Sequence, residues 1–321
     1  MRRAGRRETR AHEKAVQTAV VLGPLELPNP IIAASGTYGH GDEVARYGDP
    51  RCLGAITVKS LCADPWLGNP APRLHLAAAG MLNAVGLQGP GVSAWVESDL
   101  PRLRALGARV IASVWGHSVE DFARAAKLLI PARDDLVAVE VNVSCPNVHR
   151  RSEMFAHDSE ATAAAVAAVV DVDLALPVFA KLSPNVTDLV PIARAACEAG
   201  AHGLTLVNTV MGIAIDAETR RPVLGSTGGG LSGPAIKPVA LRAVHDVTRA
   251  LPHIPVIGTG GVQSGTDAIE MLLAGASAVG VGTAGFLDPR APHRVLNELR
   301  VWCSSHGVTR VSELVGALED S

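Results

Sequence analysis

The sequence contains few aromatic residues and little net charge, and each scarcity excludes a class of partner. Phe, Trp and Tyr together make up 3% of the 321 residues, which argues against the aromatic stacking platforms that bind single-stranded nucleic acid. The net charge is only −2, so no bulk attraction to nucleic acid is expected. No stretch is long and apolar enough to predict a membrane span. We therefore expect neither nucleic acid nor a membrane as a partner.

Cysteine is also scarce, and its spacing excludes two further classes. The five cysteines are odd in number and scattered, and no CxxC pair occurs, so neither a disulfide framework nor a metal site is expected. This pattern favours a reduced, cytoplasmic protein in which cysteines other than Cys145 fill space in the core. These other cysteines are Cys52, Cys62, Cys197 and Cys303.

The two ends of the chain differ in character. Residues 1–18 are predicted to form a disordered basic tail, because "MRRAGRRETRAHEK" carries charge with no apolar segment behind it. Glu8 and Glu13 argue against a transit peptide. Residues 19–321 contain no linker or low-complexity tract, so they are predicted to form a single domain.

Eight apolar runs alternate with helical segments along this domain. Near-continuous apolar runs predict parallel strands covered on both faces. Eight such units favour a closed (β/α)8 TIM barrel over an open doubly wound sheet. The predicted strands are Pro30–Ser35, Gly54–Ser60, Arg109–Gly116, Val137–Ser144, Pro177–Ser183, His202–Thr209, Ile254–Gly261 and Ala276–Thr283. The predicted helices include Val119–Ile130, Glu160–Val170, Val186–Ala199, Lys237–Ala250 and Gly265–Ala274.

Glycine-rich turns follow the last two predicted strands. They are "GTGGV" (Gly258–Val262) and "GVGTAGF" (Gly280–Phe286). In a barrel, loops at these places often bind phosphate through backbone N–H groups, and glycine lets the backbone come close because it has no Cβ. No GxxxxGK[ST] motif occurs, so this is not a P-loop. The turns therefore predict a ligand that carries phosphate.

Two lysines, Lys59 and Lys181, lie near strand ends on opposite sides of the predicted barrel. A cation beside an electron-accepting ring stabilises the anion that forms on reduction, so the lysines and the phosphate loops fit flavin mononucleotide, FMN. The same residues also fit a Schiff-base aldolase, in which one lysine is the nucleophile. The residues alone leave both possibilities open.

The segment "VNVSCPN" places Cys145 just beyond the fourth strand, in a loop fixed by Pro146. A thiol there can act as a base if nearby cations favour the thiolate, and the alternative is a cysteine that only fills space. Carboxamides offer both donor and acceptor groups, as a cyclic imide or pyrimidine requires. "MLNAVGLQGPG", predicted as a loop after the second strand, adds backbone groups around Gly86. The asparagines concerned are Asn83, Asn142, Asn147 and Asn208.

These and other motifs resemble the class 1 dihydroorotate dehydrogenases, most closely the NAD-linked 1B catalytic subunit. The resemblance covers about Val20 to Pro289, with the motifs in the same order. Class 2 enzymes resemble the barrel too, but they have serine at the position of Cys145 and an N-terminal membrane helix. The motifs are "ASGTYGHG", "AITVKS", "GNPAPR", "GMLNAVGLQGPG", "VNVSCPN", "AKLSPNVTD", "NTVMGIAID", "GGGLSGPAIKPVALR", "IGTGGV" and "LLAGASAVGVGTA".

The resemblance implies an FMN-dependent oxidation of (S)-dihydroorotate to orotate in pyrimidine biosynthesis. Cys145 would remove the C5 proton, and the C6 hydride would pass to flavin N5. It also implies a homodimer and a partner subunit that carries FAD and an iron–sulfur cluster. Substrate would be held by Lys59, Asn83, Val85, Gly86, Leu87, Asn142, Asn147, Asn208 and Thr209. FMN would be held by Ser35, Lys59, Ser60, Asn142, Lys181, Val207, Gly233, Gly260, Gly261, Gly282 and Thr283.

The chain departs from this family pattern at three places. Ser113 stands where the family usually has an asparagine that contacts the flavin, and its hydroxyl could reach the flavin through water. Gly89 replaces a common asparagine in a turn. The segment Val148–Asp158, "VHRRSEMFAHD", replaces a glycine-rich lid. Because this segment differs from the family's lid, the substrate could be another dihydropyrimidine or a cyclic imide, oxidised by an FMN-dependent dehydrogenase. A non-catalytic flavin-binding subunit is a further alternative.

Overall fold

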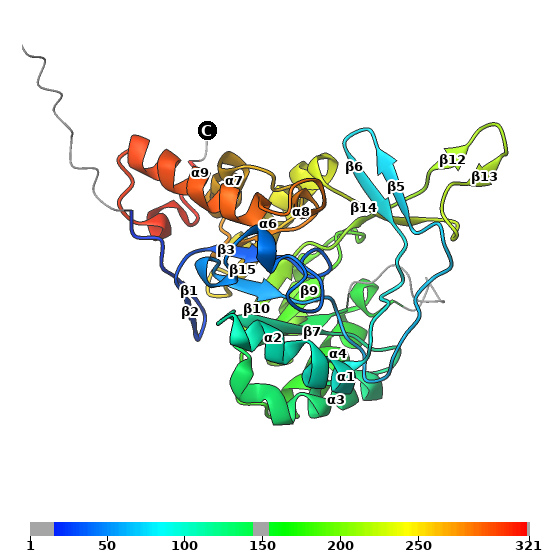
Figure 1. The fold of residues 1–321 in the computed structure, drawn as a ribbon. Helices are drawn as coiled ribbons and strands as arrows, with labels where there is room; N and C mark the ends of the chain where they lie inside the picture. The colour runs from blue at the N-terminus through cyan, green and yellow to red at the C-terminus, as the bar shows by residue number, and fades with distance from the viewer. Residues whose placement is uncertain (1–15, 144–153, 320–321) are drawn as a thin grey trace, which may run out of the picture.

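The computed structural model describes residues 16–143 and 154–319. Eight parallel strands close into a barrel in which β16 pairs with β3 (Figure 1). Each predicted strand contains one of them, so the predicted (β/α)8 barrel is confirmed and the open sheet is wrong. The barrel strands are β3 (Ile31–Ala33), β4 (Ala55–Thr57), β7 (Val110–Val114), β8 (Ala138–Asn142), β9 (Val178–Leu182), β10 (Gly203–Leu206), β15 (Val256–Thr259) and β16 (Ala278–Val281).

Every residue of these eight strands is buried. Helices cover the outside and side chains fill the inside, which is why the strands appear in the sequence as continuous apolar runs. A few buried strand residues are nevertheless polar, and such groups are costly unless they are hydrogen-bonded. They include Ser113, Glu140, Asn142, Lys181 and Thr205.

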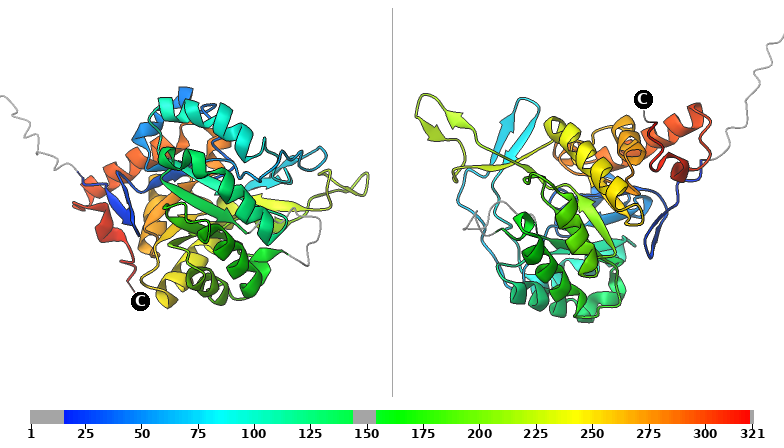
Figure 2. Two further views of the ribbon diagram at one scale, coloured as in Figure 1. Left: turned by 90° about the horizontal axis from the view of Figure 1, so that it is seen from below. Right: turned by 180° about the vertical axis from the view of Figure 1, so that it is seen from behind.

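Helices surround the barrel, and each of the predicted helices is present (Figures 1 and 2). The helix expected from Val186 begins instead at Val190, because the Asp188 carboxylate accepts a hydrogen bond from the Val190 N–H and Pro191 lies in the first turn. The main helices are α3 (Val119–Leu128), α4 (Ser159–Val170), α5 (Val190–Glu198), α6 (Lys237–Ala250), α7 (Gly265–Leu273) and α9 (Ala291–Ser305). Shorter helical segments are α1 (Val92–Ser98), α2 (Leu100–Ala105), α8 (Ala284–Leu287), η1 (Ala45–Tyr47), η2 (Pro50–Cys52), η3 (Ile130–Asp135), η5 (Phe155–His157), η6 (Pro234–Ile236) and η7 (Val311–Leu314).

A four-stranded antiparallel sheet rises beside the mouth of the barrel. It is built from the connection after β4 and the connection after β10. A separate two-stranded hairpin, within the connection after β10, projects from one side of the molecule in all three views (Figures 1 and 2). The prediction that Met81–Gly91 is a loop is wrong at its start, since Met81–Asn83 lie in β6 and pair with β14. The strands are β5 (Leu74–Ala77), β6 (Gly80–Asn83), β11 (Val210–Gly212) and β14 (Gly229–Ser232), and the hairpin is β12 (Ile215–Asp216) with β13 (Arg221–Pro222).

A short hairpin, β1 (Val20–Leu22) with β2 (Leu25–Leu27), lies at the opposite end of the barrel. Its turn at Gly23 approaches the His202 carbonyl, just before β10, and the Pro255 ring, just before β15. Residues 1–15 of the predicted tail lie outside the described residues. Gln17, near the end of the predicted tail, forms an isolated parallel β-bridge with Arg310. In the part of the chain that is described, no helix is long and apolar enough to cross a membrane.

Candidate active site

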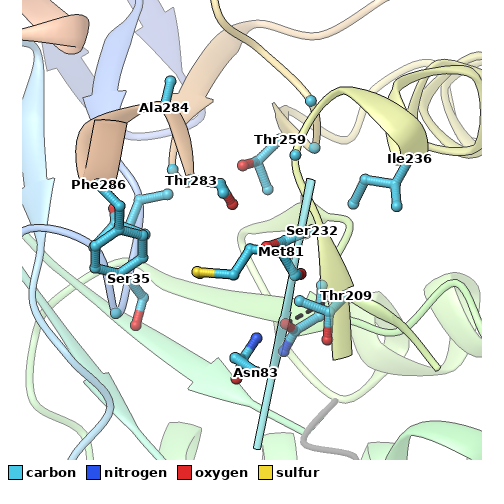
Figure 3. A pocket seen from close by; sticks show the side chains of 18 of the residues that line it. Ser35, Met81, Asn83, Thr209, Ser232, Ile236, Thr259, Thr283, Ala284 and Phe286 are labelled. Carbon is cyan, nitrogen blue, oxygen red and sulfur yellow. Dashed lines mark hydrogen bonds between the residues drawn. The ribbon is translucent and has the colours of Figure 1, made fainter. Parts of the chain in front are cut away.

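A pocket lies at the C-terminal end of the barrel, between the strand ends and the antiparallel sheet. Among the described residues, its walls come from the ends of every barrel strand except β7, from β5, β6 and β14 of the sheet, and from α8. Figure 3 shows Met81 of β6 extending into the space between Thr283, after β16, and Asn83. The topology therefore gathers residues from both halves of the chain around one cavity.

All the residues predicted to hold a cofactor line this pocket. They are Ser35, Lys59, Ser60, Asn142, Lys181, Val207, Gly233, Gly260, Gly261, Gly282 and Thr283. Of those predicted to hold substrate, Lys59, Asn83, Val85, Asn142, Asn208 and Thr209 line it as well. Gly86 and Leu87 do not line it, and Cys145 and Asn147 lie outside the described residues. Sequence reasoning missed Met81, Ser232, Gln263 and Phe286, which are also in the wall.

The pocket wall is positively charged. It contains Lys59 and Lys181, and no Asp or Glu is found among its described residues. Lys181 is buried in β9, with 8% of its side chain exposed. A buried cation in a wall that contains no described carboxylate favours an anionic ligand.

The glycines after β15 are required by packing within the protein. A Cβ at Gly261 would lie 2.6 Å from the Lys237 Cβ, and one at Gly260 would lie 2.7 Å from the Ala240 Cβ. Gly261 also has a φ of +79°, which favours glycine. Contact with α6 therefore already requires glycine at these two positions. The close approach of a phosphate, which was the predicted reason, is not needed to explain them.

Gly282, after β16, is different. A Cβ there would come no nearer than 3.6 Å to the Ala34 Cβ, which is an ordinary contact, so the packing of the chain does not require glycine. Gly282 lines the pocket, and any side chain at this position would occupy space beside the pocket wall. Glycine at position 282 therefore leaves space beside the pocket wall, as the prediction of a bound phosphate requires. This space is called the phosphate cradle below.

Asp267 of α7 fixes the loop that follows Gly261. Its Oδ2 accepts hydrogen bonds from the backbone N–H groups of Gln263 and Ser264, both 2.9 Å long, and completes a capping box with Ser264. Its Oδ1 accepts a 2.6 Å bond from Nζ of Lys237, at the start of α6. The loop is thus held to both helices by one carboxylate.

Replacing Asp267 by asparagine should lower the free energy of unfolding by about 1–3 kcal/mol at pH 7, because charge-assisted bonds become neutral. Burial alone would raise the pKa of Asp267, but bonds from Lys237, Gln263 and Ser264 outweigh it and lower the pKa below its ordinary value. The stabilisation is therefore present above the unfolded value, about 3.9, and is lost as the pH falls through the folded value.

Urea denaturation of wild-type and D267N protein from pH 7 to pH 3 tests this expectation. The difference between the two proteins should shrink in the acid part of the range. Glu270→Gln is the matched control, because Glu270 contacts the same lysine but its side chain is 39% exposed, so its loss should cost little. Equal losses in the two variants would contradict the assignment.

A chain of hydrogen-bonded polar side chains runs from the pocket wall into the barrel interior. The Ser60 Oγ lies 3.2 Å from the Ser35 Oγ and 2.9 Å from the Ser113 Oγ, and accepts a 3.0 Å bond from the Asn142 Nδ2. The Ser113 hydroxyl in turn donates to Glu140, at 3.0 Å. Ser113 is fully buried and does not line the pocket. Its hydroxyl binds inward, to Glu140, and contact with a flavin through water stays a prediction.

Glu140 was not predicted, although one signal was present. It is the single acidic residue in the apolar run "VAVEVNV", and a carboxylate inside a buried strand needs partners. The partners come from three other barrel strands: Ser113 of β7, Lys181 of β9 and Thr205 of β10.

The carboxamides at the mouth contact one another and the sheet. The Asn208 Nδ2 donates to the Asn142 Oδ1 at 3.3 Å, and its Oδ1 accepts from the Thr209 N–H at 2.9 Å. The Asn83 Nδ2 donates to the Gly230 carbonyl of β14 at 3.2 Å. These bonds fix the direction of each amide before any ligand arrives.

The backbone around Gly86 is held from outside the pocket. The Trp66 Nε1 donates to the Gly86 carbonyl at 2.9 Å, and the Val85 carbonyl accepts from the Asn69 N–H at 3.0 Å. Leu87 follows with a φ of 58°. Two carbonyls of this turn are therefore engaged within the protein, and of its three predicted substrate positions only Val85 lines the pocket.

The described cysteines differ in exposure. Cys303 is buried, Cys62 and Cys197 are partly buried, and Cys52 is exposed on η2, so the expectation that all four fill the core is wrong for Cys52. Burial raises the pKa of the Cys197 thiol to about 11. None of these four lines the pocket. A raised thiol pKa disfavours a thiolate base. Among the residues described, no His, Cys, Asp and Glu group could hold a metal ion.

Comparison with known proteins extends the similarity over nearly the whole chain. The model of the family described as dihydroorotate dehydrogenase matches residues 17–302. Three relatives named dihydroorotate dehydrogenase B (NAD(+)), catalytic subunit, are similar throughout. The one from Desulforamulus reducens is 48% identical over 93% of this chain and 97% of its own. The one from Geobacter metallireducens is 46% identical over 95% and 99%, and the one from Desulforudis audaxviator is 48% identical over 94% and 97%.

These similarities confirm the predicted family and its B type, and they agree with a closed barrel whose polar strand ends meet in one pocket. An aldolase on the same architecture has no support from them. The chain belongs to the dihydroorotate dehydrogenase family of oxidoreductases.

Proposed function

We propose that this protein oxidises (S)-dihydroorotate to orotate in pyrimidine biosynthesis, with FMN bound in the pocket at the C-terminal end of the barrel. The observation that carries the proposal is the convergence of every predicted cofactor position on that one pocket. The relatives' names, which specify dihydroorotate dehydrogenase, support the choice of substrate.

The residues of the pocket fit FMN. Gly282 leaves room beside the wall for a phosphate, with the backbone of Gly260 and Gly261 fixed nearby. Lys181 supplies a buried positive charge on the opposite side of the barrel. FMN bound here would accept the hydride from C6 of dihydroorotate at its N5 atom.

Cys145 is proposed to take the C5 proton as a thiolate, which leaves the substrate with the C5–C6 double bond of orotate once the hydride has left. Lys59 lines the pocket and would meet the carboxylate of the substrate. Asn142 and Asn208 are already oriented by their mutual hydrogen bond, so they can hold the N–H and C=O groups of a pyrimidine ring at little entropic cost.

Anaerobic mixing tests the function directly. Purified yellow protein should lose the long-wavelength absorbance of its flavin when dihydroorotate is added, and one equivalent of orotate should form. Protein that contains FMN but bleaches only with a different dihydropyrimidine would contradict the proposed substrate. Protein that bleaches with none would show a non-catalytic flavin-binding subunit.

The relatives are named catalytic subunits, which supports a partner that carries electrons onward. We propose a subunit with FAD and an iron–sulfur cluster, as the resemblance to the NAD-linked class 1B enzymes implies. We further propose a homodimeric core in the cytoplasm. Reduction of NAD by dihydroorotate should require the partner, and its occurrence with the isolated chain would contradict this division of labour.

Two glycine substitutions should distinguish a glycine that the fold requires from a glycine that FMN binding requires. Gly261→Ala should lower the free energy of unfolding by about 1–3 kcal/mol, because its Cβ would meet Lys237 at 2.6 Å. Gly282→Ala should change it by less than about 0.5 kcal/mol yet weaken FMN binding about tenfold, as a methyl group intrudes beside the phosphate. Apoprotein titrated with FMN, together with thermal unfolding, measures both. Unchanged FMN affinity in Gly282→Ala would contradict the phosphate cradle.

A further inference from the structure

A carboxylate lies beneath the pocket, out of reach of any ligand in it. Glu140 occupies the middle of β8, and only 3% of its side chain is exposed. Its Oε1 accepts a 3.0 Å hydrogen bond from the Ser113 hydroxyl, and its Oε2 accepts one of 3.0 Å from the Thr205 hydroxyl. Donors from β7, the adjacent strand, and from β10, beyond β9, thus make each carboxylate oxygen a hydrogen-bond acceptor.

Lys181 lies between this carboxylate and the pocket. Its Nζ is 3.9 Å from the Glu140 Oε1. Lys181 lines both the pocket and a small cavity beneath it, whereas Glu140 lines only the lower cavity. Glu140 therefore makes no contact with a pocket ligand, and the charged group that lies between its carboxylate and the pocket is the Lys181 ammonium.

We propose that Glu140 is a positioning residue that moderates the positive charge of Lys181 and so sets how strongly the protein stabilises reduced flavin. The inference rests on the proposed FMN site. Both side chains are almost dry, so their charges are screened by protein rather than by water and are felt across several ångströms. The hydroxyls of Ser113 and Thr205 keep the carboxylate at a fixed place beside the ammonium.

This arrangement suits an enzyme whose reduced flavin must pass its electrons on to an acceptor. A bare buried lysine would stabilise the reduced, anionic flavin strongly and would hinder its reoxidation. A carboxylate behind the lysine reduces that stabilisation without occupying the pocket. Glu140 should therefore lower the reduction potential of the flavin relative to a protein in which Lys181 acts alone.

Sulfite affinity measures this effect without turnover. Sulfite adds to N5 of oxidised flavin to form an anionic adduct, so its dissociation constant reports the positive charge near the ring. In FMN-loaded protein, Glu140→Gln should tighten sulfite binding about tenfold, the order expected for removal of one charge at this range. Glu140→Met removes the same charge with an apolar side chain of similar length and should act in the same direction.

Glu140→Asp is the matched control, because it keeps the carboxylate. Its sulfite dissociation constant should stay within about threefold of the wild-type value, whereas a merely structural role would make the shorter side chain as disruptive as glutamine or more so. Fully flavinated E140Q or E140M protein with unchanged or weakened sulfite binding would overturn the inference alone. Wild-type protein that takes up no FMN would overturn the proposed function and this inference with it.

Discussion

Cys145→Ala should slow the reduction of bound flavin by dihydroorotate about 10²–10⁴-fold, the usual contribution of a general base. The barrier rises because no group then takes the C5 proton as the C6 hydride leaves. Anaerobic stopped-flow absorbance of the flavin measures this step alone. FMN content and sulfite affinity should be unchanged, since the thiol is proposed to act on substrate and not on the cofactor.

Cys197→Ala is the matched control for the loss of a thiol. Cys197 lies on α5, away from the pocket wall, and burial raises its pKa to about 11, so its removal should leave the rate of flavin reduction unchanged. A Cys145→Ala protein that reduces its flavin at the wild-type rate would show that the base lies elsewhere.

Lys181→Met should have the second largest effect, on both chemistry and stability. It removes the buried cation that faces the pocket, so flavin reduction should slow about 10²–10³-fold, and sulfite should bind more weakly. It also leaves Glu140 buried without its ammonium partner, which should lower the free energy of unfolding by about 3 kcal/mol. Stopped-flow reduction and urea denaturation measure the two effects.

The double variant Lys181→Met/Glu140→Gln separates them. With both charges removed, no uncompensated carboxylate remains, so at least half of the lost stability should return. Flavin reduction should stay slow, because the cation is still missing. If the double variant is no more stable than Lys181→Met, the contact of 3.9 Å between Lys181 and Glu140 is not an energetic pair.

The barrel could be predicted from sequence because its strands are buried along their whole length. Runs such as Val110–Val114 contain no exposed residue, and this leaves an unmistakable apolar pattern between helices. The start of α5 is harder to predict, because a local hydrogen bond from the Val190 N–H to the Asp188 carboxylate competes with a longer helix.

The antiparallel sheet could not be predicted from local pattern. Asn83 of β6 pairs with Gly230 of β14, and their hydrogen bond joins residues 147 positions apart. Pairing at that distance depends on the closed barrel, which brings the two connections together at one end. The same closure places Met81 in the pocket wall, and nothing in its immediate sequence indicates this.

Within the site, the resemblance predicted every cofactor position and most of the described substrate positions that line the pocket, Gly86 and Leu87 excepted, but not the layer below it. Ser113 illustrates the difference: its position suggested contact with a flavin, whereas its hydroxyl binds Glu140. The roles of Gly260 and Gly261 also needed the structure, because their contacts with α6 are made by Ala240 and Lys237, which are distant from them in the sequence. Contacts across strands and helices decide such roles, and composition carries no trace of them.

A crystal structure of the protein with FMN and orotate tests the central claim most directly. We expect the phosphate beside Gly282, the flavin ring between Lys181 and the ligand, and the Cys145 sulfur over the opposite face of orotate, within reach of C5. A flavin in another place, or a Cys145 sulfur remote from the bound pyrimidine, would contradict the account.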